Sequence, residues 1–270
     1  MNFKTLNAIL LTLIFYYFFP AAQSAVSLKE LKNMAAKFKN QMNDLSYKQT
    51  KRNLLIKFVD DSIFAYADYN ATQNIITVSP MIANEINHYD EFSQVLCHEL
   101  GHFIAGNPMD ERLKRNRNGS YQRSVFSAEG QAEYFSSFCL KQNWVNADEQ
   151  TNLKKFNELT SFFEFPQEAA SIKKICPENN YLCMRILGVH YLTKFKMSLF
   201  KGKKLVSFSD PDLRIMPFTI QGLGIYPSPQ CLLDNGVASV LCQDDMDQFL
   251  KLGSCLDLKF TRPACWFKQE

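Results

Sequence analysis

The stretch YDEFSQVLCHELGHFI, residues 89–104, places apolar side chains at three- and four-residue steps. This spacing is typical of an amphipathic helix, and the Gly-Asn-Pro sequence at residues 106–108 is expected to end it. His98 and His102 are four residues apart, so they project from the same face of the helix. The sequence therefore predicts a helix that carries two imidazoles side by side.

Two imidazoles on one helix face can bind a single zinc ion. Glu99 lies beside them, where a carboxylate can take a proton from an attacking water molecule. A chance match is the alternative, but the chain has only 4 histidines, and this match lies on a predicted helix. We therefore predict two zinc ligands, His98 and His102, and a general base, Glu99.

A catalytic zinc ion usually has three protein ligands and one open position. A second predicted helix, residues 127–140, begins with Glu129 and Glu133, which are four residues apart and share a face. Glu129 is the predicted third ligand, and Glu133 is the predicted partner of a ligand histidine. The alternative is two solvated glutamates favoured by the helix dipole. His88 and His190 are the other candidates for the third ligand.

This combination resembles the gluzincin metallopeptidases, and most closely the family of the HtpX protease and the CAAX prenyl protease. In that family, HExxH is followed by a helix reading E-x-x-x-D, whose Glu binds the metal. Here Glu129 matches the ligand and Glu133 stands in place of the Asp. The resemblance covers roughly residues 54–235. It implies an α+β fold, with a mainly helical zincin-like domain, a small sheet flanking the metal-binding helix and a Cys-rich C-terminal appendage.

The segment upstream of the motif also resembles that family. In such enzymes the strand before the metal-binding helix pairs with extended substrate, through main-chain hydrogen bonds and side-chain pockets. The resemblance implies that four residues form this strand here: Ile75, Ile76, Thr77 and Val78.

A late Tyr-Pro-Ser-Pro-Gln segment, residues 226–230, resembles a His-Pro step whose histidine helps to stabilise the tetrahedral intermediate in the family. Tyr226 stands in place of that histidine. A phenol can donate a hydrogen bond to an oxyanion, but it cannot supply an imidazolium. We expect Tyr226 to support catalysis, or His190 if it folds nearby. The alternative is that Tyr226 packs beside a Pro-rich turn.

The first residues have the order of a secretory signal peptide, with Lys4, an apolar run over residues 6–19, and small residues before a cleavage site after Ser24. A membrane anchor is the alternative, but a bilayer needs about 20 apolar residues. We therefore expect no stable membrane span after cleavage. The expected organisation is a signal peptide over residues 1–24, a metallopeptidase domain over residues 25–230, and the appendage over residues 231–270.

The chain has eight cysteines, and an even number in an exported protein indicates disulfides. The simplest pairing joins sequence neighbours: Cys176–Cys183, Cys231–Cys242 and Cys255–Cys265. A bridge between Cys97 and Cys139 is favoured because their helices must meet at the zinc. Two buried free thiols are the alternative.

A formal net charge of +3 is too small to indicate nucleic acid or an anionic membrane as a partner. The expectation is a zinc-dependent endopeptidase, periplasmic or secreted, with Zn²⁺ as cofactor. It would hydrolyse peptide bonds in exported or envelope proteins, and its role would be quality control of envelope proteins. One alternative is a non-catalytic, zinc-binding envelope chaperone or assembly factor. Another is a disulfide-rich binding module with a chance motif.

Overall fold

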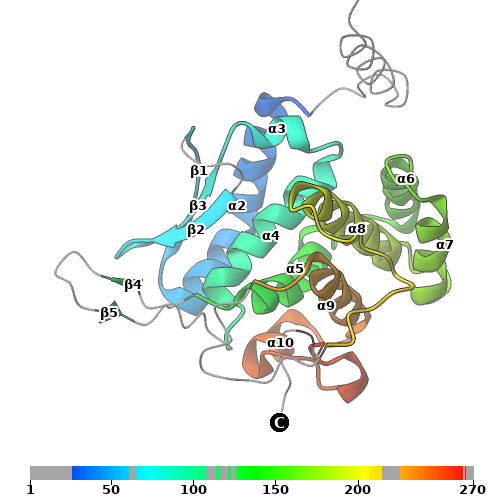
Figure 1. Ribbon diagram of the computed structural model, residues 1–270. Helices are drawn as coiled ribbons and strands as arrows, with labels where there is room; N and C mark the ends of the chain where they lie inside the picture. The colour runs from blue at the N-terminus through cyan, green and yellow to red at the C-terminus, as the bar shows by residue number, and fades with distance from the viewer. Residues whose placement is uncertain are drawn as a thin grey trace, which may run out of the picture.

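The protein is an α+β structure in which helix α4 (Tyr89–Ile104) lies between a small sheet and a group of helices (Figure 1). The computed structural model describes residues 26–60, 65–107, 114–115, 121–122, 126–214, 226–263 and 265. The other helices are α2 (Leu28–Thr50), α3 (Ile82–Glu85), α5 (Glu129–Asn143), α6 (Glu149–Thr160), α7 (Pro166–Ile175), α8 (Tyr181–Phe200), α9 (Pro229–Leu241), α10 (Met246–Leu252) and the short 3₁₀ helix η2 (Leu258–Phe260). The strands are β1 (Asn53–Phe58), β2 (Ala65–Tyr69), β3 (Gln73–Val78), β4 (Lys114–Arg115) and β5 (Tyr121–Gln122).

The larger sheet has the strand order β1-β3-β2, with β1 parallel and β2 antiparallel to β3. Within it, Ile76 pairs with Ile56 on one side and with Ala67 on the other. This central strand contains the four residues predicted to pair with substrate: Ile75, Ile76, Thr77 and Val78. That prediction is wrong, because β1 and β2 already occupy both sides of β3. Among the described strands, β2 forms the edge on the side of α4.

The start of α4 is held by a cap and by an ion pair. The Nδ1 of His88 accepts the backbone N–H of Asp90 at 3.2 Å, and the carboxylate of Glu91 accepts the N–H of His88 at 3.0 Å. Arg185 of α8 donates two hydrogen bonds of 2.7 Å to Asp90, and both side chains are buried. Such bidentate, charge-assisted pairs fix orientation. His88 is therefore a helix cap, and α8 anchors the helix that carries the motif.

Helices α4 and α5 approach each other closely at Gly101. A Cβ atom added there would lie 2.8 Å from the Cα and the carbonyl oxygen of Ala132. The disulfide between Cys97 and Cys139 joins the same two helices, with 5.6 Å between the Cα atoms. The glycine and the disulfide together hold the histidine-bearing part of α4 against the start of α5.

All eight cysteines form disulfides. The predicted Cys97–Cys139 and Cys176–Cys183 bridges are present. The other two predicted pairs are wrong, because the bridges are Cys231–Cys265 and Cys242–Cys255. Cys231 lies near the start of α9 and Cys242 directly follows its end. A step of 11 positions along a helix spans about 16 Å, well beyond the reach of a disulfide.

The helix predicted over residues 89–104 agrees with α4, and the one predicted over residues 127–140 agrees with α5 apart from its ends. The expected boundary after residue 230 falls within α9, whose Leu232 and Leu233 are fully buried. Because α9 packs against α5 and α8, a unit that began at residue 231 would divide a core helix.

No helix among the described residues is long and apolar enough to cross a lipid bilayer. The predicted signal peptide lies outside the described residues. Four disulfides are typical of a protein from an oxidising compartment.

Candidate metal centre

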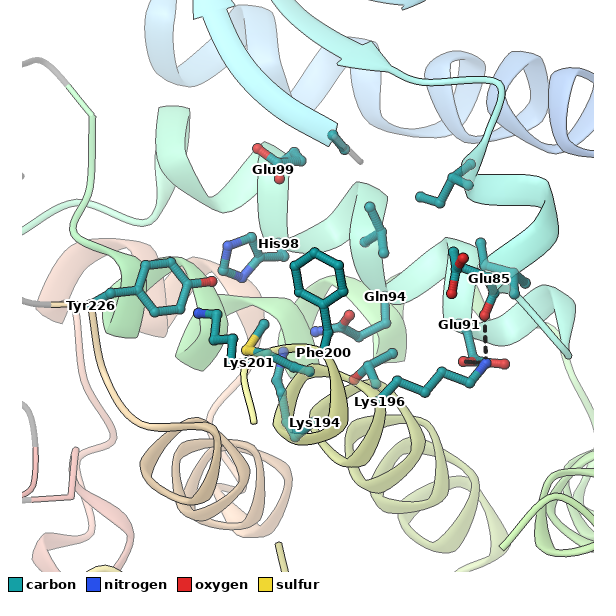
Figure 2. Close-up of a pocket in the computed structure, with 16 residues that line it drawn as sticks. Glu85, Glu91, Gln94, His98, Glu99, Lys194, Lys196, Phe200, Lys201 and Tyr226 are labelled. Atoms are coloured by element: carbon teal, nitrogen blue, oxygen red, sulfur yellow. Dashed lines mark hydrogen bonds and ion pairs between the residues drawn. The ribbon is translucent and has the colours of Figure 1, made fainter. Parts of the chain in front are cut away.

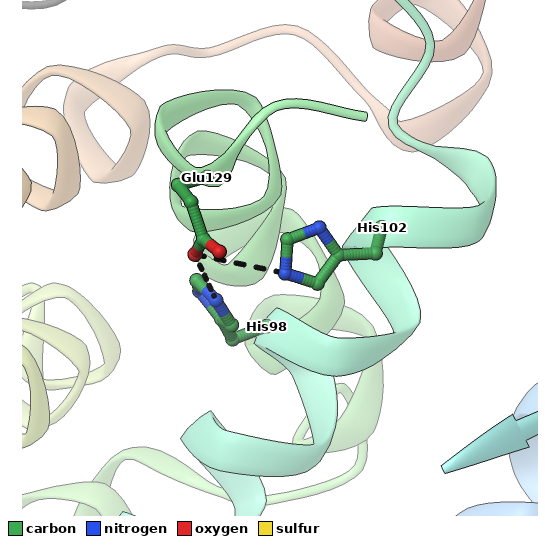
Figure 3. A group of neighbouring side chains, drawn as sticks. All are labelled: His98, His102 and Glu129. Atoms are coloured by element: carbon green, nitrogen blue, oxygen red, sulfur yellow. Dashed lines mark hydrogen bonds and ion pairs between the residues drawn. The ribbon is translucent and has the colours of Figure 1, made fainter. Parts of the chain in front are cut away.

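Three side chains from two helices converge where α4 meets α5 (Figure 3). His98 and His102 lie on one face of α4, and Glu129 is the first residue of α5. The Oε2 of Glu129 lies 3.2 Å from the Nε2 of His98 and 3.7 Å from the Nε2 of His102. One ligand atom from each residue lies within 4.8 Å of the others. The structure thus brings together the three residues predicted as metal ligands.

These separations suit a tetrahedral zinc ion, whose nitrogen and oxygen ligands lie about 3.4 Å from one another. The measured 3.2 Å and 3.7 Å fall on either side of this value. Two imidazoles and one carboxylate are also a ligand set that zinc uses in catalytic sites, where a fourth position stays open. The residues present therefore fit the ion.

The second nitrogen of each histidine is held by a hydrogen bond. The Nδ1 of His98 lies 2.9 Å from the Oε2 of Glu133, and the Nδ1 of His102 lies 2.8 Å from the carbonyl oxygen of Ser127. Because both oxygens accept, each Nδ1 carries a proton, and each Nε2 is the atom that can bind a cation once it is unprotonated. Metal-binding histidines commonly have such partners, and Glu133 occupies the place predicted for one.

Glu133 is fully buried and receives several donors. Its Oε1 lies 2.8 Å from the Nδ1 of His190 and accepts from Gln94 at 3.0 Å, while its Oε2 accepts from Lys194 at 2.8 Å. Burial raises the pKa of Glu133, but the charge of Lys194 and the hydrogen bonds of His190 and His98 lower it well below the usual value. Glu133 is therefore a carboxylate at neutral pH.

A proton and a metal ion would compete for the same atom of His98, its Nε2. Burial lowers its pKa, but hydrogen bonds with Glu129 and Glu133 outweigh burial and raise the pKa to about 10. Because a proton on Nε2 must leave before a metal ion can bind there, metal binding releases that proton.

Glu99 lies next to His98 in α4 and is 8% exposed. Its side chain lines a cavity beside the ligand cluster (Figure 2). Burial raises the pKa of Glu99, and the charges of His102 and His98 partly offset this effect. A carboxylate with a raised pKa is a stronger base, which suits proton transfer near neutral pH.

Tyr226 lines the same cavity, and Figure 2 shows its hydroxyl directed toward His98. Tyr226 as a whole is 40% exposed, but burial of its hydroxyl group and the negative charge of Glu129 raise its pKa well above the usual value, so the phenol stays protonated and can donate. The Nζ of Lys201, at the end of α8, lies 3.7 Å from the centroid of the Tyr226 ring. A cation over an aromatic ring is attracted by it, so this end of the cavity combines a phenol with a positive charge.

The alternative ligands are not in the cluster. His88 caps α4, and its Nε2 lies 3.2 Å from Glu158. His190 is fully buried, and its Nε2 lies 2.9 Å from the hydroxyl oxygen of Ser137. A Cβ atom at Gly236 would lie 2.7 Å from the His190 ring, so α9 packs directly against it. Among the described residues, Glu133 connects His190 to the metal-binding cluster.

Two functional candidates were missed in the sequence, Lys194 and Lys201. One signal was available for Lys194. It lies four residues after His190 on a mostly apolar helix, so both polar groups share one face. No local pattern marks Lys201, because its relation to Tyr226 depends on how distant segments pack.

Two further groups of residues place potential ligand atoms close together. Their members are Asp212, Cys231 and Cys265 in one group, and Cys242, Asp244 and Cys255 in the other. Each group contains a disulfide, so its sulfur atoms are not thiolates and do not bind zinc in this form.

Comparison with known proteins gave no match, since no family model, no curated protein and no solved structure resembles this chain at a significant level.

Proposed function

We propose that this chain is a zinc-dependent endopeptidase of the gluzincin type. One observation carries the proposal. Both histidines of the motif direct Nε2 toward Glu129, while Glu133 and a backbone carbonyl hold their Nδ1 atoms. A cluster that served only to stabilise the fold would not require this pair of orientations.

His98, His102 and Glu129 would hold the zinc ion. When bound, zinc would polarise the scissile carbonyl group and lower the pKa of a water molecule. Glu99 takes the proton from the attacking water and later passes it to the leaving amine. The raised pKa of the Glu99 carboxyl supports both transfers, because the group can hold the proton between them.

The developing oxyanion needs a donor, and Tyr226 supplies one from the wall of the cavity. Its raised pKa keeps the hydroxyl proton in place. The ammonium of Lys201, close to the Tyr226 ring, adds positive charge at this end. Together these residues would replace the histidine that the resembled family uses.

A peptide substrate also needs a place for its backbone. Strand β2 lies at a sheet edge among the described strands, and its Ala65 lines the cavity. Strand addition at such an edge gives affinity through main-chain hydrogen bonds. We assign this role to β2 instead of β3.

Export to an oxidising compartment is part of the proposal. The four disulfides support it, and so does the order of residues 1–24. Its substrates would then be other exported or envelope proteins.

Metal removal separates a peptidase from a chaperone. We expect one zinc ion per chain, and cleavage of unfolded casein that a chelator stops and added zinc restores. A protein that bound zinc and prevented aggregation of casein without cleaving it would support the chaperone and contradict the peptidase.

A further inference from the structure

A cavity of about 430 Å³ opens beside the metal-binding cluster. It begins at His98 and Glu99 and runs between the first half of α4 and the last turns of α8 (Figure 2). Its size is within the range of small-molecule and side-chain binding sites, about 300–1,000 Å³.

The walls of this cavity are mainly apolar. Its apolar lining residues are Ala65, Ile82, Ile86, Val95, Met197 and Phe200. Phe200 is 67% exposed, although it is a large aromatic residue. Figure 2 shows its ring standing among the lining side chains, so a ligand that entered the cavity would cover it.

Two of the charges inside the cavity are already compensated. The Nζ of Lys196 donates to the Oε2 of Glu91 and to the backbone oxygen of Glu85, both at 2.7 Å. Lys194 is paired with Glu133. The Lys194–Glu133 pair is buried, whereas Lys196 is 28% exposed. An acidic ligand side chain would have to compete with Glu133 or Glu91 for these ammonium groups, and breaking a buried pair is costly. The interior therefore favours an uncharged, apolar ligand group.

We propose that this cavity is a specificity pocket that binds one large, uncharged apolar side chain, such as Phe, Leu or Met, of the substrate residue next to the cleaved bond. The inference rests on the proposed peptidase function, since it takes its place in the substrate from the neighbouring His98 and Glu99. It adds a substrate class that the metal-binding residues alone do not define.

The test uses alanine-based hexapeptides with blocked ends and one variable residue. The variable side chain is the only large one, so it determines how the peptide is positioned in the site. Binding is measured by calorimetry to the zinc-loaded Glu99→Gln protein, which does not consume the peptide. Peptides with Phe or Leu should bind at least about tenfold more tightly than the all-alanine peptide, because burial of such a side chain is worth that much. Peptides with Asp or Lys should bind no more tightly than the all-alanine peptide.

A variant in which a larger side chain fills the cavity should lose this selectivity. Val95→Phe, from the α4 wall, should reduce the preference for Phe over Ala by about tenfold. Met197→Trp, from the α8 wall, repeats the test should the first variant fold poorly. The matched control is Val145→Phe at a residue that is 62% exposed and outside the cavity. It should keep the preference of the parent protein, and zinc content should be equal in all variants.

Wild-type protein is then given the Phe peptide, and the products are identified by mass spectrometry. Cleavage on one side of the Phe supports the inference. Equal binding of the Phe and Ala peptides would overturn it, even if casein were cleaved normally. A clear preference for Phe without any cleavage would leave the pocket in place and contradict the peptidase function.

Discussion

At the scale of single residues, Glu133 links a metal ligand to the interior of the protein. It holds the Nδ1 of His98 and is balanced by Lys194 and His190. Glu133→Gln should weaken zinc binding by about 10- to 100-fold, because the amide is a poorer acceptor for His98. Competition with a chromophoric chelator measures this affinity.

Loss of the Glu133 charge would also leave Lys194 buried without a counter-charge. The double variant Glu133→Gln/Lys194→Met removes both charges and serves as the control. It should unfold at nearly the wild-type temperature and still bind zinc weakly. Wild-type zinc affinity in this double variant would show that Glu133 does not position His98.

Tyr226 is the second residue whose role can be isolated. Tyr226→Phe removes only the hydroxyl and should lower kcat by about 100-fold, as the loss of one oxyanion donor does, with little change in KM. The control is Tyr47→Phe on α2, where the tyrosine is 50% exposed. An unchanged kcat for Tyr226→Phe would support the simple packing role for this residue.

At the scale of elements, the close contact of α4 and α5 depends on Gly101. Gly101→Ala places a methyl group against the Ala132 backbone, so a helix must shift. The free energy of unfolding should fall by about 1–3 kcal/mol, and zinc affinity should fall with it. The control is Gly188→Ala on α8, where the nearest atoms are side-chain carbons at 3.5 Å. Denaturant unfolding should show no loss there, and an equal loss in both variants would contradict the explanation.

Helix α9 carries a carboxyl group that makes stability depend on pH. Burial raises the pKa of Asp234 from 3.8 to about 6, although hydrogen bonds from Asp212 and Gln230 act in the opposite direction. Between these two values the folded protein holds a proton that the unfolded chain has lost, so stability falls as pH rises.

The variant Asp234→Asn isolates this effect. The unfolding free energy of wild type minus that of the variant should fall by about 1–2 kcal/mol between pH values of about 4 and 6. It should be constant at higher pH. Urea unfolding across this range measures the difference, and a difference that rose with pH would contradict the assignment.

Sequence reasoning succeeded for elements whose signals are local. The period of residues 89–104 and its terminating Gly-Asn-Pro sequence gave α4, and the spacing of Glu129 and Glu133 gave their shared face on α5. It failed where pairing is non-local. The hydrophobic run of β3 does not reveal that β1 and β2 pair with its two sides. Close cysteine spacing does not reveal that α9 keeps Cys231 and Cys242 apart.

At the scale of the whole molecule, the site is assembled from segments that are far apart in sequence. Helix α4 supplies two ligands and the base, α5 supplies the third ligand, and α8 supplies Lys194 and Lys201. The contact between α4 and α5 could be predicted from the sequence, because a zinc ion needs ligands from both helices. The contribution of α8 could not, because it follows from packing that the buried Arg185–Asp90 pair helps to fix.

The central claim is that zinc at His98, His102 and Glu129 supports peptide hydrolysis with Glu99 as the base. Its most direct test compares casein cleavage and zinc content in wild type, Glu99→Gln and the exposed control Glu178→Gln. We predict one zinc ion per chain in all three proteins, normal cleavage by the control, and cleavage at least about 100-fold slower in Glu99→Gln. Wild-type cleavage by Glu99→Gln, or a wild-type protein that binds no zinc, would contradict the account.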